Sequence, residues 1–187
     1  EQLSILKDNI FNSIATKAIP RAAVVDSLPI ESCGSNVIVV ASGSCDSLLS
    51  SAQVIAKLVE SNYDKNFIII DIGNETFTDF ALQCNPSKNP LRWLQGLASL
   101  DEVLCETGFE NTKLSSLSIT SFNEAYLLNV DWNERIQELS VYPAIVIINL
   151  GCIGNLVKNH LFYSFSKVAK SYVVAKASPY NLRAVYM

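Results

Sequence analysis

The sequence predicts an α/β domain with a doubly wound, mostly parallel sheet flanked by helices. Strand-like and helix-like segments alternate along the chain, which is typical of this class. The strongest strand-like runs are continuous β-branched stretches, as expected for strands buried on both faces. The length of 187 residues suits one sizeable core. We therefore expect residues 1–187 to form a single domain.

In the first half of the chain, hydrophobic periodicity predicts helices and strands in turn. The apolar residues of Glu1–Ala18 follow helical spacing, and Pro20 ends that segment. Asn36–Ala41 is a continuous β-branched run between small residues, and it predicts a buried strand. Ser47–Glu60 places its apolar residues on one helical face. Further elements predicted here are the short strand Ala22–Val25, the strand Phe67–Ile72 and the mixed helical segment Leu91–Cys105.

The second half continues the alternation. Its strongest element is the strand Ala144–Leu150, which reads AIVIINL. Helical spacing precedes and follows this strand, so a parallel sheet with right-handed crossovers is expected. The other predicted elements are a weaker strand at Leu114–Ile119, helices at Asn123–Leu139 and Leu156–Ala169, a strand at Tyr172–Ala177 and a last helix opened by Pro179.

Composition and charge exclude several classes of protein. Hydrophobic residues make up 49% of the chain and charged residues 17%, so disorder is excluded as the dominant state. The net charge of -4 does not fit a nucleic-acid-binding domain. No apolar run approaches the roughly 18–20 residues that span a bilayer. Because the chain begins at Glu1 rather than Met, we interpret it as a soluble fragment of a longer protein.

The five cysteines give no metal or disulfide pattern. Their number is odd, and no pair has the CxxC spacing of zinc or redox motifs. We therefore expect free thiols in a reducing compartment and no metal site. The cysteines are Cys33, Cys45, Cys84, Cys105 and Cys152.

A phosphate-binding arrangement is suggested by the segment that follows Asn36–Ala41. Ligands of parallel sheets bind at the carboxyl ends of the strands. Here a strand, a small-residue loop and a helix follow one another, as in a phosphate-binding loop. Such a loop needs glycines, a Lys for the β- and γ-phosphates and a Ser or Thr for Mg²⁺.

The order of these elements resembles the cytoplasmic domain of bacterial tyrosine kinases (BY-kinases), within the MinD/ParA-like P-loop ATPases. Glu1, Ser4 and Lys7 have the spacing of the family's E-x-x-R-x-x-R oligomerisation motif. VIVVASGSCDSLLSSAQVIA stands in place of the Walker A segment, and FIIID supplies Asp71 at the Walker A′ position. The segment from Tyr142, YPAIVIINLG, stands in place of the Walker B strand. The resemblance runs across nearly all of the chain.

The phosphate loop departs from the family pattern. Leu48 stands where the Walker A Lys belongs, and Leu49 where the Mg²⁺-binding Ser or Thr belongs. Cys45 and Ser47 replace loop glycines. Asp46 and Ser47 are interpreted as N-caps of the following helix. The degenerate positions of this loop are Cys45, Asp46, Ser47, Leu48, Leu49 and Ser50.

The acidic positions of the resemblance are also depleted. Asn149 replaces the Walker B Asp, and Gly73 replaces the second Asp of Walker A′. Asp71 remains, either as an ancestral active-site acid or as a solvated or capping carboxylate. His160, the only histidine, is expected on a helix surface. Because phosphoryl transfer relies on Lys and Mg²⁺ to neutralise charge, we hypothesise a pseudo-enzyme without cofactor or metal.

The resemblance implies a role in exopolysaccharide or capsule chain-length control and export. The predicted function is a structural module on the cytoplasmic side of the inner membrane. It would associate with itself through Glu1, Ser4 and Lys7, and with a membrane polysaccharide co-polymerase region. One alternative is an atypical ATP- and Mg²⁺-using ATPase or tyrosine kinase with a relocated Lys. Another is a MinD/ParA-like localisation factor with a divergent P-loop. The nearby cations considered were Lys57, Lys65, Lys88 and Arg92.

Overall fold

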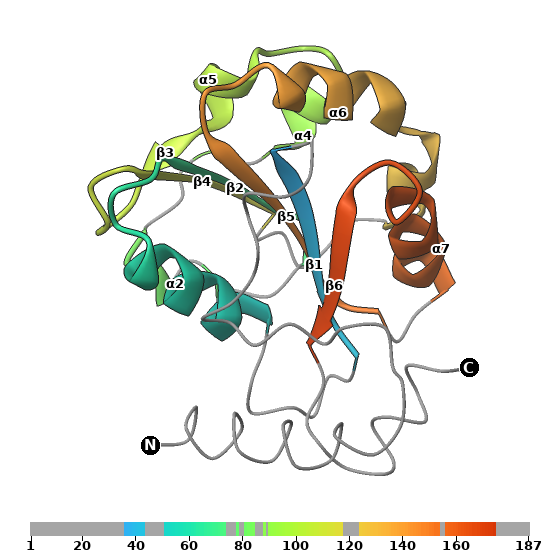
Figure 1. Cartoon of the computed structure of the whole chain (residues 1–187). Helices are drawn as coiled ribbons and strands as arrows, with labels where there is room; N and C mark the ends of the chain where they lie inside the picture. Colours follow the sequence, from blue (N-terminus) through green and yellow to red (C-terminus); the bar gives the residue numbers. More distant parts are fainter. Residues whose placement is uncertain are drawn as a thin grey trace, which may run out of the picture.

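The computed structural model forms a six-stranded sheet with helices on both faces (Figure 1). The predicted α/β class, with a mostly parallel sheet, is confirmed. The predicted segments 1–18 and 22–25, and the helix opened by Pro179, lie outside the described residues. The structure describes residues 36–43, 51–73, 78, 81–84, 88, 90–117, 124–153 and 156–174.

The sheet has the order β3-β4-β2-β5-β1-β6. Every neighbouring pair is parallel except the pair of β3 with β4 at one edge. The central strands are apolar and buried along nearly their whole length, as the continuous β-branched runs predict. The strands are β1 (Val37–Ser42), β2 (Phe67–Asp71), β3 (Cys105–Glu106), β4 (Thr112–Ser116), β5 (Ile145–Cys152) and β6 (Lys170–Val174).

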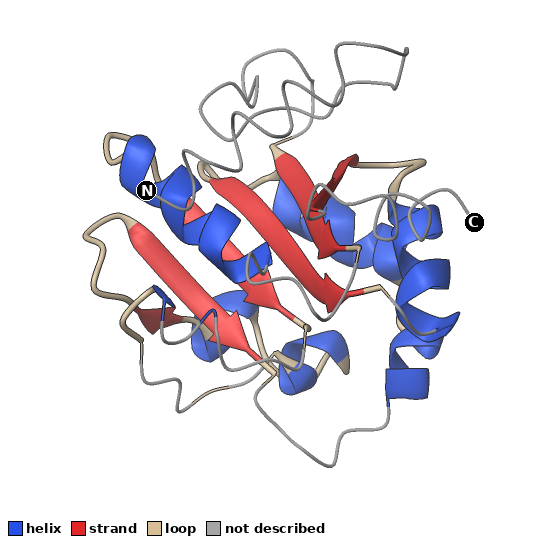
Figure 2. Ribbon diagram, turned by 90° about the horizontal axis from the view of Figure 1, so that it is seen from below, coloured by secondary structure: helices blue, strands red, loops and turns tan. Residues whose placement is uncertain are grey.

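The helices cover both faces of the sheet (Figure 2). On one face, α2 packs Ile55 and Leu58 against strand residues such as Ile69. On the other face, α4, α5, α6 and α7 contribute to a larger cluster with Ile70 and Ile148. The helices are α2 (Ser51–Ser61), α4 (Leu91–Leu94), α5 (Leu100–Val103), the 3₁₀-helix η3 (Glu124–Asn129), α6 (Trp132–Ser140) and α7 (Leu156–Phe165).

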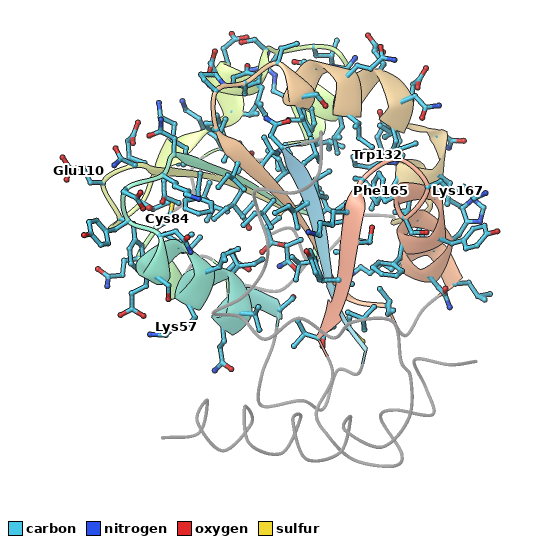
Figure 3. The ribbon with its side chains drawn as sticks, in the orientation of Figure 1. Lys57, Cys84, Glu110, Trp132, Phe165 and Lys167 are labelled. Carbon is cyan, nitrogen blue, oxygen red and sulfur yellow. The ribbon has the colours of Figure 1, made fainter. Side chains whose placement is uncertain are left out.

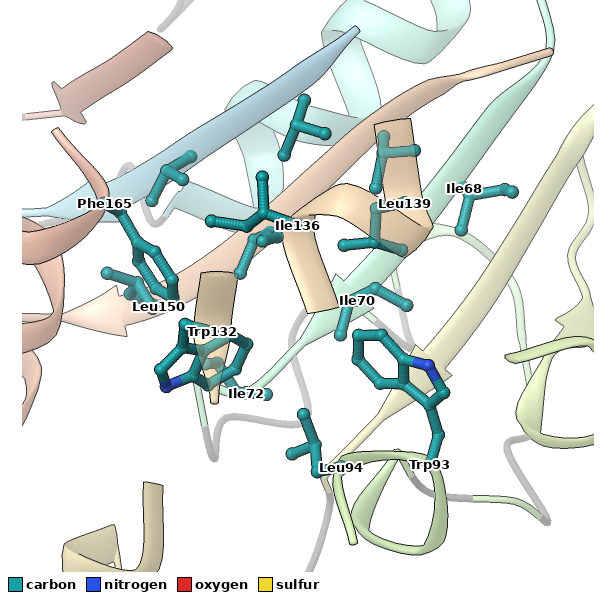
Figure 4. Packing of buried hydrophobic residues seen from close by; sticks show 14 of the residues in the cluster. Ile68, Ile70, Ile72, Trp93, Leu94, Trp132, Ile136, Leu139, Leu150 and Phe165 are labelled. Atoms are coloured by element: carbon teal, nitrogen blue, oxygen red, sulfur yellow. The ribbon is translucent and has the colours of Figure 1, made fainter. Parts of the chain in front are cut away.

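Trp93, Trp132 and Phe165 lie among the aliphatic side chains of the larger cluster (Figure 4). The rings of Trp132 and Phe165 meet edge to face with centroids 4.8 Å apart, which joins α6 to α7. Both residues also lie together in Figure 3. The indole nitrogen of Trp132 donates to the carbonyl of Leu127 at 2.8 Å, so its polar atom is satisfied in the core. This packing fixes α7 against the sheet.

Two predicted helical segments are each divided in the structure. Asn123–Leu139 was expected as one helix, but η3 ends at Asn129 and α6 begins at Trp132. Asp131 separates them because its side chain accepts a hydrogen bond from the amide of Glu134 at 3.2 Å and so caps α6. Within Leu91–Cys105, the turn at Gly96, where φ is +70°, separates α4 from α5.

The prediction of free thiols is wrong for Cys152. Cys84 and Cys105 form no disulfide, as expected. Cys152, at the end of β5, takes part in a disulfide whose partner lies outside the described residues. The sequence showed no CxxC pair, but tertiary structure can bring distant cysteines together. Separately, no helix among the described residues has the length and apolarity needed to cross a membrane.

Candidate functional site at the carboxyl edge of the sheet

The residues that could form a site gather where β2 and β5 end. The crossovers after β1 and β5 use helices on opposite faces, so the topological switch point of the sheet lies between the carboxyl ends of β1 and β5, next to this place. Asp71 is the last residue of β2, and Asn149 lies directly opposite it on β5. The structure thus brings together two of the positions singled out in the sequence. Both are buried, with 1% of Asp71 and 1% of Asn149 exposed.

Asn149 uses both ends of its amide group inside the protein. Its Nδ2 donates to the hydroxyl of Thr78 at 3.1 Å. Its Oδ1 accepts from the backbone amide of Gly151 at 3.0 Å. An aspartate at this position would accept the second bond but has no hydrogen to donate to Thr78 as Asn149 does. The asparagine therefore suits a structural bond that the Walker B acid would not make in the same way.

Gly73 and Gly151 are in close backbone contact beside this pair. A Cβ on Gly73 would lie 2.8 Å from Oδ1 of Asp71 and 3.0 Å from the amide nitrogen of Gly151. A Cβ on Gly151 would lie 2.8 Å from the Cα of Gly73, and the φ of Gly151 is +63°. The backbone at 73 therefore has no room for a side chain. An acidic side chain at position 73 would not fit without a shift of these neighbours.

Asp71 is a buried carboxylate, so a solvated role for it is wrong. Its Oδ1 accepts a hydrogen bond from the amide of Gly73 at 2.7 Å, which stabilises the turn after β2. That bond supports the capping interpretation of this side chain. Burial of a carboxylate is costly unless hydrogen bonds or an opposite charge compensate. The bond from Gly73 is one such compensation.

Sequence reasoning missed Lys158, which supplies a cation at this edge. The residue lies on α7 and only 4% of it is exposed. Its Nζ donates to the carbonyl of Gly73 at 2.6 Å, across 85 positions of sequence. A signal was present, because Lys158 stands three and seven residues before the buried Leu161 and Phe165. A lysine on the apolar stripe of a helix is a reason to look for a buried polar partner.

The cations considered from sequence lie elsewhere. Lys57 forms an exposed ion pair with Glu60 at 2.9 Å, on the outer side of α2 (Figure 3). Lys88 donates to the carbonyl of Leu104 at 3.4 Å. Arg92 is exposed, and Lys65 is partly exposed. His160 is exposed on α7, as its sequence context predicts. None of these side chains is placed with Asp71 and Asn149 by the contacts of the described residues.

Other sequence-predicted positions lie outside the described residues. These are the degenerate loop positions Cys45, Asp46, Ser47, Leu48, Leu49 and Ser50, and the oligomerisation positions Glu1, Ser4 and Lys7.

The described residues at this edge do not fit a bound Mg²⁺. Magnesium prefers carboxylate, phosphate and water oxygens in octahedral geometry. Asn149 offers a neutral oxygen that already accepts from Gly151, and Gly73 offers no side chain. The buried ammonium of Lys158 adds positive charge, which opposes a dication. Within the described part of the chain, no cluster of three or more His, Cys, Asp or Glu residues could hold a metal ion.

Comparisons with known proteins show the fold. No protein-family model matches the sequence. No curated protein sequence matches it. Among solved structures, the chimerical protein CapA2B2 is similar, with a TM-score of 0.57 and 14% sequence identity. The match covers 96% of this chain and 80% of that chain. The likeness therefore extends over the whole α/β architecture while the sequences have diverged widely.

Proposed function

We propose that this chain is a catalytically degenerate BY-kinase-like domain that serves as an interaction module of exopolysaccharide or capsule export. The motif order along the sequence supports this assignment, and the fold shared with CapA2B2 agrees with it. The proposed place of action is the cytoplasmic side of the inner membrane. The proposed partners are further copies of this chain and a membrane polysaccharide co-polymerase region.

The observation that carries the proposal is the set of internal hydrogen bonds at the carboxyl edge of β2 and β5. There, Asn149 donates to Thr78 and accepts from Gly151. Gly73 leaves no space for a second acid. Charge-assisted contacts to phosphate and metal contribute roughly 1.5–3 kcal/mol each, and an active site of this class depends on several of them. A domain that keeps the fold without these contacts retains surfaces for protein binding.

Calorimetric titration of the domain with ATP and with ADP, each with Mg²⁺, tests the loss of nucleotide chemistry. We expect no heat of binding and no rise in melting temperature at millimolar nucleotide, because a ligand of the native state must stabilise it. ATP hydrolysis and tyrosine autophosphorylation should be at background. Micromolar binding or measurable turnover would overturn the proposal.

Sedimentation velocity over a range of concentrations tests the interaction role. We expect oligomers that grow with concentration, and we expect a Glu1→Ala/Lys7→Ala variant to shift the distribution toward monomer. Lys57→Ala is a suitable control because Lys57 lies exposed on α2, in a local pair with Glu60. A domain that stays monomeric at high concentration, alone and with the co-polymerase region, would contradict the interaction role.

One observation favours a second candidate, an atypical nucleotide-binding enzyme. Lys158 brings a buried ammonium to the carboxyl edge, where parallel α/β sheets bind ligands. In that case its Nζ would leave the carbonyl of Gly73 and contact a phosphate. Nucleotide would then bind the native chain and fail to bind a Lys158→Met variant. The same titration therefore separates the two candidates.

A further inference from the structure

Two buried charged side chains converge on a single residue, Gly73. Among the described residues, only Asp71 and Lys158 are both formally charged and buried, with 1% and 4% exposed. One is an acid and the other a base. Oδ1 of Asp71 accepts from the Gly73 amide at 2.7 Å, and Nζ of Lys158 donates to the Gly73 carbonyl at 2.6 Å. Opposite charges therefore bind the two polar groups of one residue.

The place of Lys158 in the fold makes a packing role insufficient. Its position on α7 faces the same core as Leu161 and Phe165, which favours an apolar side chain. Burying an ammonium there is costly unless hydrogen bonds and an opposite charge compensate. A leucine or methionine would fill the same space without that cost. The ammonium group must therefore contribute through its charge and its hydrogen bond.

We propose that the Lys158 ammonium is the resident cation of the carboxyl edge. It balances the buried Asp71 carboxylate through Gly73 and holds the turn after β2 against α7. The chain itself thereby supplies positive charge near the Asp71 carboxylate, where a metal ion could otherwise supply it. This inference goes beyond the interaction role, because it concerns the contacts that hold the turn after β2 against α7, whether or not any partner binds.

Chemical rescue tests this inference directly. Lys158→Ala keeps Cβ and removes the remaining three carbons with the ammonium, a fragment equivalent to propylammonium. We expect the variant to melt about 10 °C below the native chain, since a broken buried pair is strongly destabilising. Propylammonium chloride at tens of millimolar should then raise its melting temperature by about 3–5 °C, as a ligand of the native state does.

Matched controls separate charge from shape and from ionic strength. Tetramethylammonium chloride at equal concentration carries the charge but lacks the shape and the N–H donors, and it should not rescue. Lys113→Ala removes an exposed lysine that pairs with Glu106 at 3.2 Å. That variant should lose no more than about 2 °C and should not respond to propylammonium. Absence of rescue in soluble Lys158→Ala would overturn the inference.

Removing both charges together gives a second test, in which the double variant is expected to stay folded. Lys158→Met retains helix propensity and bulk but loses the charge. We expect Lys158→Met and Asp71→Asn each to melt about 10 °C below the native chain. The double variant should recover to within a few degrees of the native chain, because no buried charge is then left unbalanced. A native-like Lys158→Met, or a double variant as weak as the sum of the singles, would overturn the inference.

These measurements contain no nucleotide and no partner protein. A negative result in the rescue experiment therefore leaves the proposed interaction role untouched. A positive nucleotide titration of the native chain would likewise overturn the proposed function without deciding how Lys158 and Asp71 are coupled.

Discussion

Two asparagines lie toward opposite edges of the central strands, and they differ in their burial and in the charge beside them. At the amino edge, Nδ2 of Asn36 donates to the carbonyls of Tyr142 and Ala144 at 2.9 and 2.8 Å. At the carboxyl edge, Asn149 bonds Thr78 and Gly151. Both amides connect segments that are distant in sequence. Among the residues that the structure describes, buried charge lies at the carboxyl edge alone, where Asp71 and Lys158 are found.

Asn149 is understood differently once it is set beside Asn36. The family resemblance predicted for it the position of a Walker B acid. Beside Asn36, it is one of two amides that fix the ends of the sheet through hydrogen bonds. A buried amide with its partners in place contributes to stability, and leaving those partners unsatisfied is costly. The two edges therefore differ in the buried charge that lies beside the asparagine.

Introducing a second acid beside Asp71 at the carboxyl edge should give the largest effect. In Asn149→Asp, a second carboxylate would stand opposite Asp71, and the donation to Thr78 would be lost. We expect a loss of about 3–5 kcal/mol in the free energy of unfolding, measured with denaturant at neutral pH. Addition of Mg²⁺ should not restore it. Native stability, or recovery with Mg²⁺, would show that this edge still accepts a catalytic acid.

Disrupting the contact between Gly73, which follows β2, and Gly151 on β5 should have the second largest effect. Gly151→Ala requires a Cβ at positive φ and only 2.8 Å from the Cα of Gly73, so we expect a loss of about 3 kcal/mol. Gly96→Ala is the matched control, since φ is +70° and nothing lies within 4 Å of the added Cβ. It should lose about 1–2 kcal/mol from backbone strain alone. Equal losses of stability in Gly151→Ala and Gly96→Ala would mean that the neighbours of Gly151 move enough to make room for the added Cβ.

Removing the amide of the amino edge should have a smaller effect. Asn36→Ala leaves the carbonyls of Tyr142 and Ala144 without their donor. Asn36 is only partly buried, so water can replace part of the interaction. We expect a loss of about 1–2 kcal/mol in denaturant unfolding. A loss as large as that of Asn149→Asp would remove the electrostatic distinction between the two edges.

An exposed carboxylate provides the smallest effect and a reference for both edges. The amide and hydroxyl of Ser99 donate to Glu102 at 2.7 and 2.9 Å, and these bonds lower the pKa of Glu102 below its ordinary value of 4.5. The resulting stability is present above the unfolded pKa and is lost as pH falls through the folded one. Carboxyl NMR titration should show the lowered pKa, and Ser99→Ala should raise it only part of the way toward 4.5, because the backbone amide at position 99 still donates to Glu102. An unchanged pKa in that variant would show that the Ser99 hydroxyl does not contribute to the shift.

The α/β class and the positions of the central strands could be predicted from the sequence alone. β1, β2 and β5 were predicted within one or two residues because continuous β-branched runs encode burial on both faces. Helix boundaries were weaker: the division at Asp131 depends on a cap within the predicted helix. The position of Asp71 at the end of β2 was readable for the same local reason, whereas Asn149 lies inside β5, which continues to Cys152.

The interactions that the polar residues of these strands make depend on tertiary contacts, which the sequence pattern does not contain. The burial of Asp71, the bond of Asn149 to Thr78 and the bond of Lys158 to Gly73 join segments 71 to 85 positions apart. Periodicity reports on which face of an element is apolar, but it carries no information about which distant group meets a polar side chain. Lys158 was overlooked for that reason, since its role arises from the contact between α7 and the turn after β2.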